Sequence, residues 1–132
     1  MARANIKASF NCDLEKVWNM VTSLENYSWR SDLSKIEVLE DGKKFVEYTT
    51  DGYSTVFTVT LFEPLKRYGF DMDNENMHGH WVGLFSYGNG ETTIDFTEDV
   101  TAKKVLLKPF VRTYLKKQQS AYVTDLKKAL FR

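Results

Sequence analysis

The fold is decided by residues 103–132, which read KKVLLKPFVRTYLKKQQSAYVTDLKKALFR. The pattern is helical from Lys103 onward and is broken only by Pro109, which either opens the main helix at its first turn or kinks it. A helix over residues 109–131 is about 34 Å long at the standard rise per residue. Apolar and aromatic side chains recur along it at three- and four-residue steps, which predicts a broad buried seam. The seam comprises Val111, Leu115, Gln118, Tyr122, Leu126 and Ala129.

Upstream of this helix the chain consists mainly of predicted strands separated by turn signals such as Asp41-Gly42 and Glu63-Pro64. Apolar residues at helical spacing after the first strand predict a helix that ends near Thr22, and residues 24–29 predict a second short helical turn. These two helices are too short to cover a sheet, so the terminal helix must lie across it. The predicted strands are 4–10, 34–40, 44–50, 53–62, 68–73, 78–87 and 92–100, which form an antiparallel meander in an α+β fold.

Composition narrows the class of protein. The 132 residues suit one domain spanning the whole chain, and aromatic residues make up 14% of it, which favours a large core or a ring-lined cavity. Eighteen basic residues balance eighteen acidic ones, so no overall charge favours nucleic acid as a partner. Cys12 is the single cysteine and no long apolar run occurs, so we expect a cytoplasmic protein without disulfides or stable membrane insertion.

Several short motifs occur in an order and spacing that together indicate a family. They are Asp13-Leu-Glu-Lys-Val-Trp18, Leu24-Glu-Asn-Tyr-Ser-Trp29, Phe62-Glu-Pro64, Gly79-His-Trp81, Gly90-Glu-Thr-Thr-Ile94 and Tyr122-Val-Thr-Asp-Leu126. Across nearly its whole length the chain resembles the START-related or SRPBCC superfamily, in particular its polyketide cyclase/dehydrase and lipid-transport group. The resemblance implies a helix-grip fold, in which a curved seven-stranded sheet wraps around the terminal helix and leaves a cavity beneath it. It implies a binding fold but no particular reaction, because members include carriers, cyclases and chaperone activators.

The predicted cavity has candidate polar contacts on two elements. On the terminal helix, Tyr114, Gln118 and Tyr122 carry polar atoms that need partners if they are buried, and a ligand can supply them. Before the second strand, Trp29 and Arg30 stand where this architecture often opens its cavity. An arginine there can hold a carboxylate or phosphate in bidentate fashion. The plainer interpretation is an aromatic plug and an Arg30–Asp32 ion pair.

Other charged residues carry weaker hypotheses. His78 and His80 alternate on one strand and so share a face, where they serve either as acid and base at the cavity mouth or as surface residues. No further histidine stands near, so we expect no metal site. Strand alternation places Glu47, Asp71 and Asp95 outside. A basic stripe of Lys104, Lys108, Arg112 and Lys116 is typical of a solvated helix face, and it also suits transient contact with anionic lipid headgroups.

We therefore predict a binding protein, a carrier or sensor of a small hydrophobic or amphipathic molecule, without cofactor. The predicted ligand contacts are Trp29, Arg30, His80, Tyr114, Gln118 and Tyr122. The first alternative is a cyclase or dehydrase acting on a polyketide-type or aromatic substrate, although the chain has no recognised catalytic motif. The second is an interaction module that binds a protein partner through its surface; the sequence does not identify such a partner.

Overall fold

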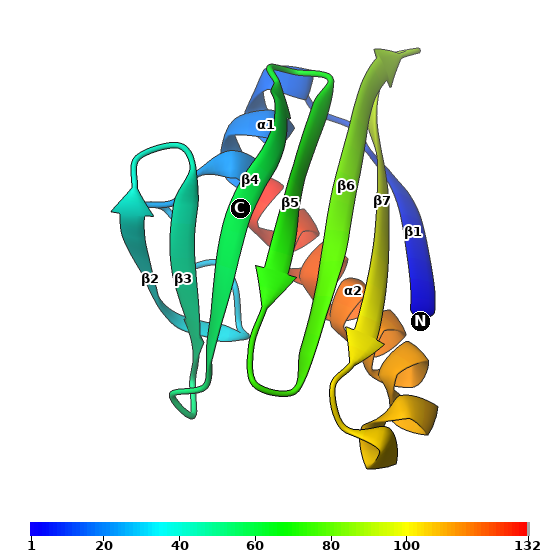
Figure 1. Cartoon of the computed structure of the whole chain (residues 1–132). Coiled ribbons are helices and arrows are strands. Elements are labelled where there is room, and N and C mark those ends of the chain that lie inside the picture. The colour runs from blue at the N-terminus through cyan, green and yellow to red at the C-terminus, as the bar shows by residue number, and fades with distance from the viewer. Residues whose placement is uncertain (132) are drawn as a thin grey trace.

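The computed structural model describes residues 1–131 and contains one seven-stranded antiparallel sheet with strand order β1-β7-β6-β5-β4-β3-β2 (Figure 1). Only β1 departs from the order of the sequence, because it pairs with β7 at the edge of the sheet. The predicted antiparallel meander is therefore confirmed. The strands are β1 (Ala2–Phe10), β2 (Leu33–Glu40), β3 (Lys44–Thr49), β4 (Ser54–Glu63), β5 (Arg67–Asp73), β6 (Met77–Gly88) and β7 (Glu91–Ala102).

One helix, rather than the predicted two, follows the first strand. This is α1 (Leu14–Thr22), and residues 23–32 form bends and turns. The Ser23 hydroxyl accepts hydrogen bonds from the backbone N–H groups of Glu25 and Asn26, at 3.3 and 2.9 Å. These are the donors that a serine accepts at the start of a helix, but here they close a turn, and no regular helix follows over residues 24–29.

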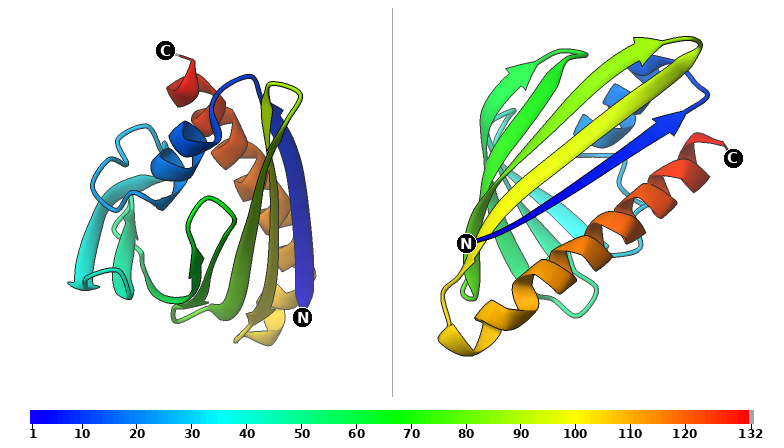
Figure 2. Two further views of the ribbon diagram at one scale, coloured as in Figure 1. Left: turned by 90° about the horizontal axis from the view of Figure 1, so that it is seen from above. Right: turned by 90° about the vertical axis from the view of Figure 1, so that its right-hand side faces the viewer.

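The terminal helix α2 (Val111–Leu130) follows a short 3-10 helix, η1 (Val105–Phe110), which contains Pro109. The proline therefore lies just before the main helix and does not interrupt its hydrogen bonding. The helix packs against β1 and β7, while the curved sheet carries β2 and β3 round to the opposite side of the concave face (Figure 2). The predicted grip of the sheet on the long helix is confirmed. Within residues 1–131, no helix is both long and apolar enough to cross a bilayer.

The core lies mainly under α1 and the C-terminal half of α2. Its centre is a cluster of rings in which Trp18 meets Phe85 edge to face at 4.9 Å and Phe70 stacks on Trp81 at 4.7 Å. A smaller apolar cluster, around Val100 and Val111, lies under the N-terminal half of α2. The residues that α2 itself buries are Val111, Leu115, Gln119, Leu126 and Leu130.

Candidate functional site

A cleft separates α2 from the strands on the far side of the curved sheet. It consists of a ring chamber of about 130 Å³, bordered by Tyr68, Trp81 and Tyr122, and an outer chamber of about 90 Å³, bordered by Tyr53 and Tyr114. The two chambers adjoin each other, since they share part of their lining. The shared residues are Asp32, Glu47, Phe57, Met72, Glu98 and Gln118.

Stacked aromatic pairs form the apolar wall of the ring chamber. Phe45 lies opposite Phe57 in the β3–β4 register, and their rings stack with centroids 5.0 Å apart. Phe70 lies opposite Trp81 in the β5–β6 register and stacks in the same way. Directly opposed residues on antiparallel strands share one face of the sheet, so each pair presents its rings to the cleft. This wall suits a flat, ring-containing molecule.

Glu98 is the unexpected group in this wall. It lies directly opposite Trp81 in the β6–β7 register, is only 6% exposed, and borders both chambers. No side chain within residues 1–131 forms a salt bridge or hydrogen bond with its carboxyl group. Burial alone raises the pKa of Glu98 to about 7, because no nearby charge or donor stabilises the carboxylate. Near neutral pH this carboxyl group therefore exists in both protonation states.

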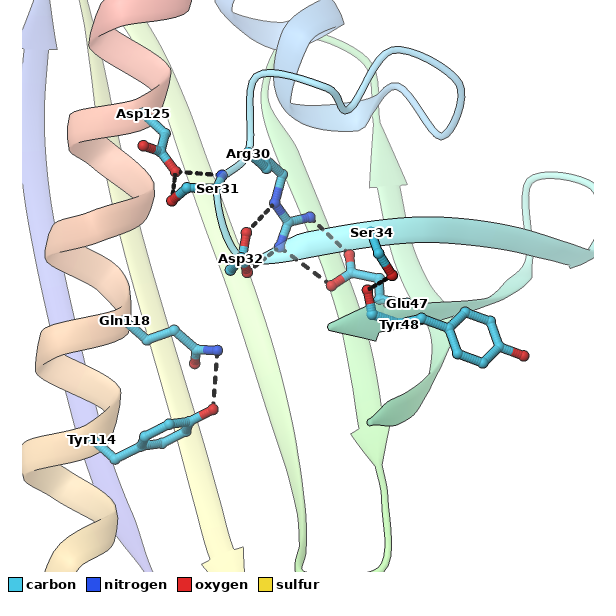
Figure 3. A network of polar contacts seen from close by, with 9 residues as sticks. All are labelled: Arg30, Ser31, Asp32, Ser34, Glu47, Tyr48, Tyr114, Gln118 and Asp125. Atoms are coloured by element: carbon cyan, nitrogen blue, oxygen red, sulfur yellow. Dashed lines mark hydrogen bonds and ion pairs between the residues drawn. The ribbon is translucent and has the colours of Figure 1, made fainter. Parts of the chain in front are cut away.

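Arg30 is held by two carboxylates of the protein at the other side of the cleft (Figure 3). Its Nη1 donates to Glu47 at 2.9 Å, and its Nη2 and Nε donate to Asp32 at 3.0 and 3.2 Å. Although burial by itself lowers the pKa of Arg30, attraction to Glu47, Tyr122 and Asp32 raises it above the ordinary value. The guanidinium also lies 5.1 Å from the centre of the Tyr122 ring. Most of its donors are thus already used within the protein.

The turn that carries Arg30 is fixed to α2. The Asp125 carboxylate accepts hydrogen bonds from the backbone N–H and the hydroxyl of Ser31, at 2.8 and 2.7 Å (Figure 3). Behind this contact, the indole N–H of Trp29 donates to the carbonyl oxygen of Asn26, and its ring packs edge to face on Tyr122 at 5.3 Å. Trp29 is therefore a buried plug behind the cleft rather than part of its lining.

The polar residues of α2 divide between the cleft and the packed interior. Gln118 borders both chambers and donates a 3.3 Å hydrogen bond to the Tyr114 hydroxyl, and both side chains are exposed to the cleft opening (Figure 3). Burial, followed by the proximity of Asp32, raises the pKa of Tyr114. The buried glutamine is the next residue, Gln119, which donates to the carbonyl oxygen of Ala4 at 3.2 Å. The predicted seam was thus displaced by one residue at this point.

Two further sequence-based assignments need correction. The side chain of His80 points away from the cleft, and its Nδ1 lies 2.7 Å from the Asp71 carboxylate at an exposed site. Strand alternation explains this position, because the neighbouring Trp81 faces inward. Glu47, which was expected outside, faces inward beside Arg30, whereas Asp71 lies outside as expected. Of the predicted contacts, Arg30, Tyr114, Gln118 and Tyr122 border the cleft, and their contact with a ligand stays a prediction.

Sequence reasoning missed Glu98, although the strand pattern contains a signal for it. Ile94, Phe96 and Val100 alternate along β7 on one face, and Glu98 occupies the inward position between the last two. A carboxylate at an apolar position of the strand period is the feature that distinguishes it from Asp95. For Glu47 the corresponding signal is Phe45, two residues earlier on the same face.

Comparison with known proteins bears on this geometry. The sequence family described as polyketide cyclase / dehydrase and lipid transport matches residues 1–130. A search of curated proteins gives no significant match.

Solved structures with the same fold are distant in sequence. A START superfamily protein from Mycobacterium smegmatis is 15% identical, with a TM-score of 0.83 over 98% of this chain and 97% of the other. A conserved protein from Geobacillus kaustophilus is 13% identical, with a TM-score of 0.82 over 97% and 94%. DynU16, a protein in the dynemicin biosynthetic locus, is 16% identical, with a TM-score of 0.80 over 98% of this chain and 47% of the other. At these identities the likeness concerns the fold alone.

Proposed function

Because the chain belongs to the polyketide cyclase / dehydrase and lipid transport family, we propose that it binds a small ring-containing molecule with a hydroxyl or amine donor. The ligand occupies the cleft between α2 and the curved sheet. The observation that carries the proposal is the Glu98 carboxyl group, which is buried in an aromatic wall without an ion-pair partner in residues 1–131. Its carboxyl oxygens are not fully enclosed, so a ligand donor in the cleft can reach them and form a hydrogen bond.

The charges around the cleft favour a donor on the ligand over an acid. Three carboxyl groups, those of Asp32, Glu47 and Glu98, border the cleft, against the single guanidinium of Arg30. That guanidinium is already bound to Asp32 and Glu47. A ligand carboxylate must therefore approach acidic groups without a free cation to balance it, which is unfavourable in a desolvated site. A phenol or an alcohol has no such penalty and donates to Glu98.

A matched pair of probes tests the proposal. Isothermal titration calorimetry measures binding of 2-naphthol and of 2-naphthoic acid, which share a ring system and differ in the polar group. We expect 2-naphthol to bind at pH 7.5 and the naphthoate anion to bind at least about tenfold more weakly. Native mass spectrometry of gently purified protein checks for a retained small molecule. If neither probe binds and no small molecule is retained, the proposal fails.

Variants of Glu98 test whether its carboxyl group contacts the ligand. Glu98→Leu removes the acceptor and keeps an apolar wall, so 2-naphthol affinity falls about tenfold; Glu98→Gln keeps an amide oxygen and loses less. Glu91→Gln, at the exposed start of the same strand, is the control and leaves affinity unchanged. Equal affinities for the wild type and Glu98→Leu would place the ligand elsewhere.

The pKa of Glu98 also supports a second function, proton transfer to or from a bound carbonyl compound. A carboxyl group with a pKa of about 7 is available near neutral pH both as acid and as base. Of the two histidines expected as acid and base, His80 lies outside the cleft and His78 borders the outer chamber; Glu98 borders both chambers and is the group we propose for this role. NMR in D2O follows exchange of the methyl protons of 2-acetylnaphthalene. Catalysis by Glu98 predicts an exchange rate that rises as pH passes about 7 and is lost in Glu98→Gln, whereas identical rates in the two proteins exclude this function.

A further inference from the structure

The 3-10 helix before α2 presents large apolar side chains to solvent. Val105 is 74% exposed, Leu106 is 85% exposed and Phe110 is 67% exposed. These three residues are named the apolar tip. None of the six residues of η1 is buried, and only Leu107 packs partly against the small cluster around Val100 and Val111. Leu107 thus attaches the segment to the protein, and η1 itself lies at one end of the molecule (Figure 2).

Basic residues flank the apolar tip in the sequence. Lys104, Lys108, Arg112 and Lys116 are all exposed, and none forms an ion pair with a carboxylate of residues 1–131. No acidic residue occurs in residues 103–124. Asp73, the last residue of β5, is paired with Lys103 at 2.7 Å. The four cations named first are therefore free to meet an external anion.

We propose that the apolar tip and these four cations form a docking surface for an anionic lipid bilayer. Exposed apolar side chains that insert at the headgroup boundary, with unpaired cations on the same segment of chain, suit such a surface through both hydrophobic and charge complementarity. Nucleic acid complements the charge of the cations but leaves Leu106 and Phe110 exposed to water. An apolar protein groove covers these two side chains but leaves the lysines without anionic partners. Charge and apolar exposure together therefore favour lipid.

The position of this surface links it to the cleft. Phe110, Tyr114 and Gln118 follow one another at four-residue steps, so they lie on one face of the helix that begins after η1. Tyr114 and Gln118 border the outer chamber. A bilayer that contacts Phe110 is thus adjacent to the opening through which an apolar molecule enters or leaves. The docking inference itself does not depend on what the cleft binds.

Flotation of the full chain with vesicles tests the proposal. We expect binding to vesicles of three parts phosphatidylcholine to one part phosphatidylglycerol, and little binding to pure phosphatidylcholine. Binding at about 0.15 M salt should weaken strongly at 1 M salt, where the screening length falls to about 3 Å. Equal binding to both vesicle types, or no binding to either, would overturn the proposal.

Two double variants separate the two contributions. Lys104→Gln with Lys108→Gln should lower the partition coefficient about 25-fold, at about fivefold for each charge near the surface. Leu106→Ser with Phe110→Ser should lower it at least about tenfold through lost apolar insertion. The matched controls are Lys127→Gln with Lys128→Gln, and Val38→Ser with Leu39→Ser, which remove exposed residues of the same kinds elsewhere. Both controls should bind as the wild type does.

Sedimentation without lipid identifies the competing occupant. If the wild type is a dimer that Leu106→Ser with Phe110→Ser converts to a monomer, and anionic vesicles do not bind, the surface joins two copies of the chain and the proposal is wrong. If the wild type sediments as a monomer and binds anionic vesicles, with loss in both double variants but in neither control, the proposal stands. Circular dichroism checks that each variant is folded before its result is counted.

Discussion

The two halves of α2 lie in different surroundings. Toward its C-terminus the helix packs against α1 and the main hydrophobic core. Leu126 and Leu130 are buried in this aromatic-rich core. Toward its N-terminus the sheet curves away on one side, so Tyr114 and Gln118 face the cleft. The same helix therefore seals the protein at one end and borders a binding space at the other. Stability should depend mainly on the C-terminal half of α2, and ligand recognition mainly on its N-terminal half.

The largest expected effect comes from truncating one tyrosine in each half. Tyr122 packs on Trp29 and Phe96 under the Arg30 guanidinium, so Tyr122→Ala should lower the free energy of unfolding by about 4 kcal/mol. Tyr114 is 47% exposed, so Tyr114→Ala should cost less than about 1 kcal/mol. Urea denaturation measures both. Similar losses would mean that the two halves are packed alike and would contradict the comparison.

The next effect is a pH dependence of the free energy of unfolding, which originates from Glu98 on the cleft side of the sheet. Burial raises the pKa of Glu98 from 4.5 to about 7, so the folded state binds more protons than the unfolded chain between these values. The contribution of Glu98 to the free energy of unfolding is therefore highest below about pH 4.5, where Glu98 is protonated in both states. It falls as pH rises through about 7, because the buried carboxyl group must then ionise. Glu98→Gln should thus be more stable than the wild type at pH 8 by up to about 3 kcal/mol, with little difference at pH 4.5.

Unfolding measured at several pH values checks this prediction. The control Glu91→Gln removes a carboxylate that is exposed in the folded protein, and its stability relative to the wild type should not change with pH. A constant difference between Glu98→Gln and the wild type across the range would show that the Glu98 carboxyl group is not desolvated.

Arg30→Leu should have a smaller effect. It removes the cation between Asp32 and Glu47, and two carboxylates are then left near each other at the cleft. Because Asp32 is partly exposed, we expect a loss of about 2 kcal/mol, below the cost of breaking a fully buried pair. Arg67→Leu, which breaks an exposed pair with Glu63, is the control and should cost clearly less than Arg30→Leu, because solvent screens an exposed pair. Urea denaturation at neutral pH compares the two variants. Equal losses would contradict the conclusion that the Arg30 ion pairs with Asp32 and Glu47 stabilise the fold.

The smallest effect concerns two adjacent glutamines. Gln119→Leu leaves the carbonyl oxygen of Ala4 without its buried donor and should cost about 1 kcal/mol. Gln118→Leu changes a side chain at the cleft and should leave stability within about 0.5 kcal/mol of the wild type. A reversed order in urea denaturation would mean that the sequence-derived seam, with Gln118 inside, was right.

The sequence was sufficient for the long helix and the strands because their periodicity is local. It was insufficient where tertiary packing determines which residue is buried. The helical period alone placed Gln118 in the seam, but contact with β1 selects Gln119. Propensity suggested a second helical turn after Thr22, but the backbone there forms only turns, the first of them closed by the Ser23 hydroxyl. Glu98 was overlooked because a carboxylate is usually outside, yet its position in the alternation of β7 places it inside.

The central claim, that the Glu98 carboxyl group faces a desolvated cleft and meets the ligand, is tested most directly by carbon-13 NMR of that carboxyl group. A pH titration should give a pKa of about 7, and 2-naphthol should shift the Glu98 resonance while leaving that of Glu91 unchanged. A pKa near the ordinary value of about 4.3, with no response to 2-naphthol, would contradict the account.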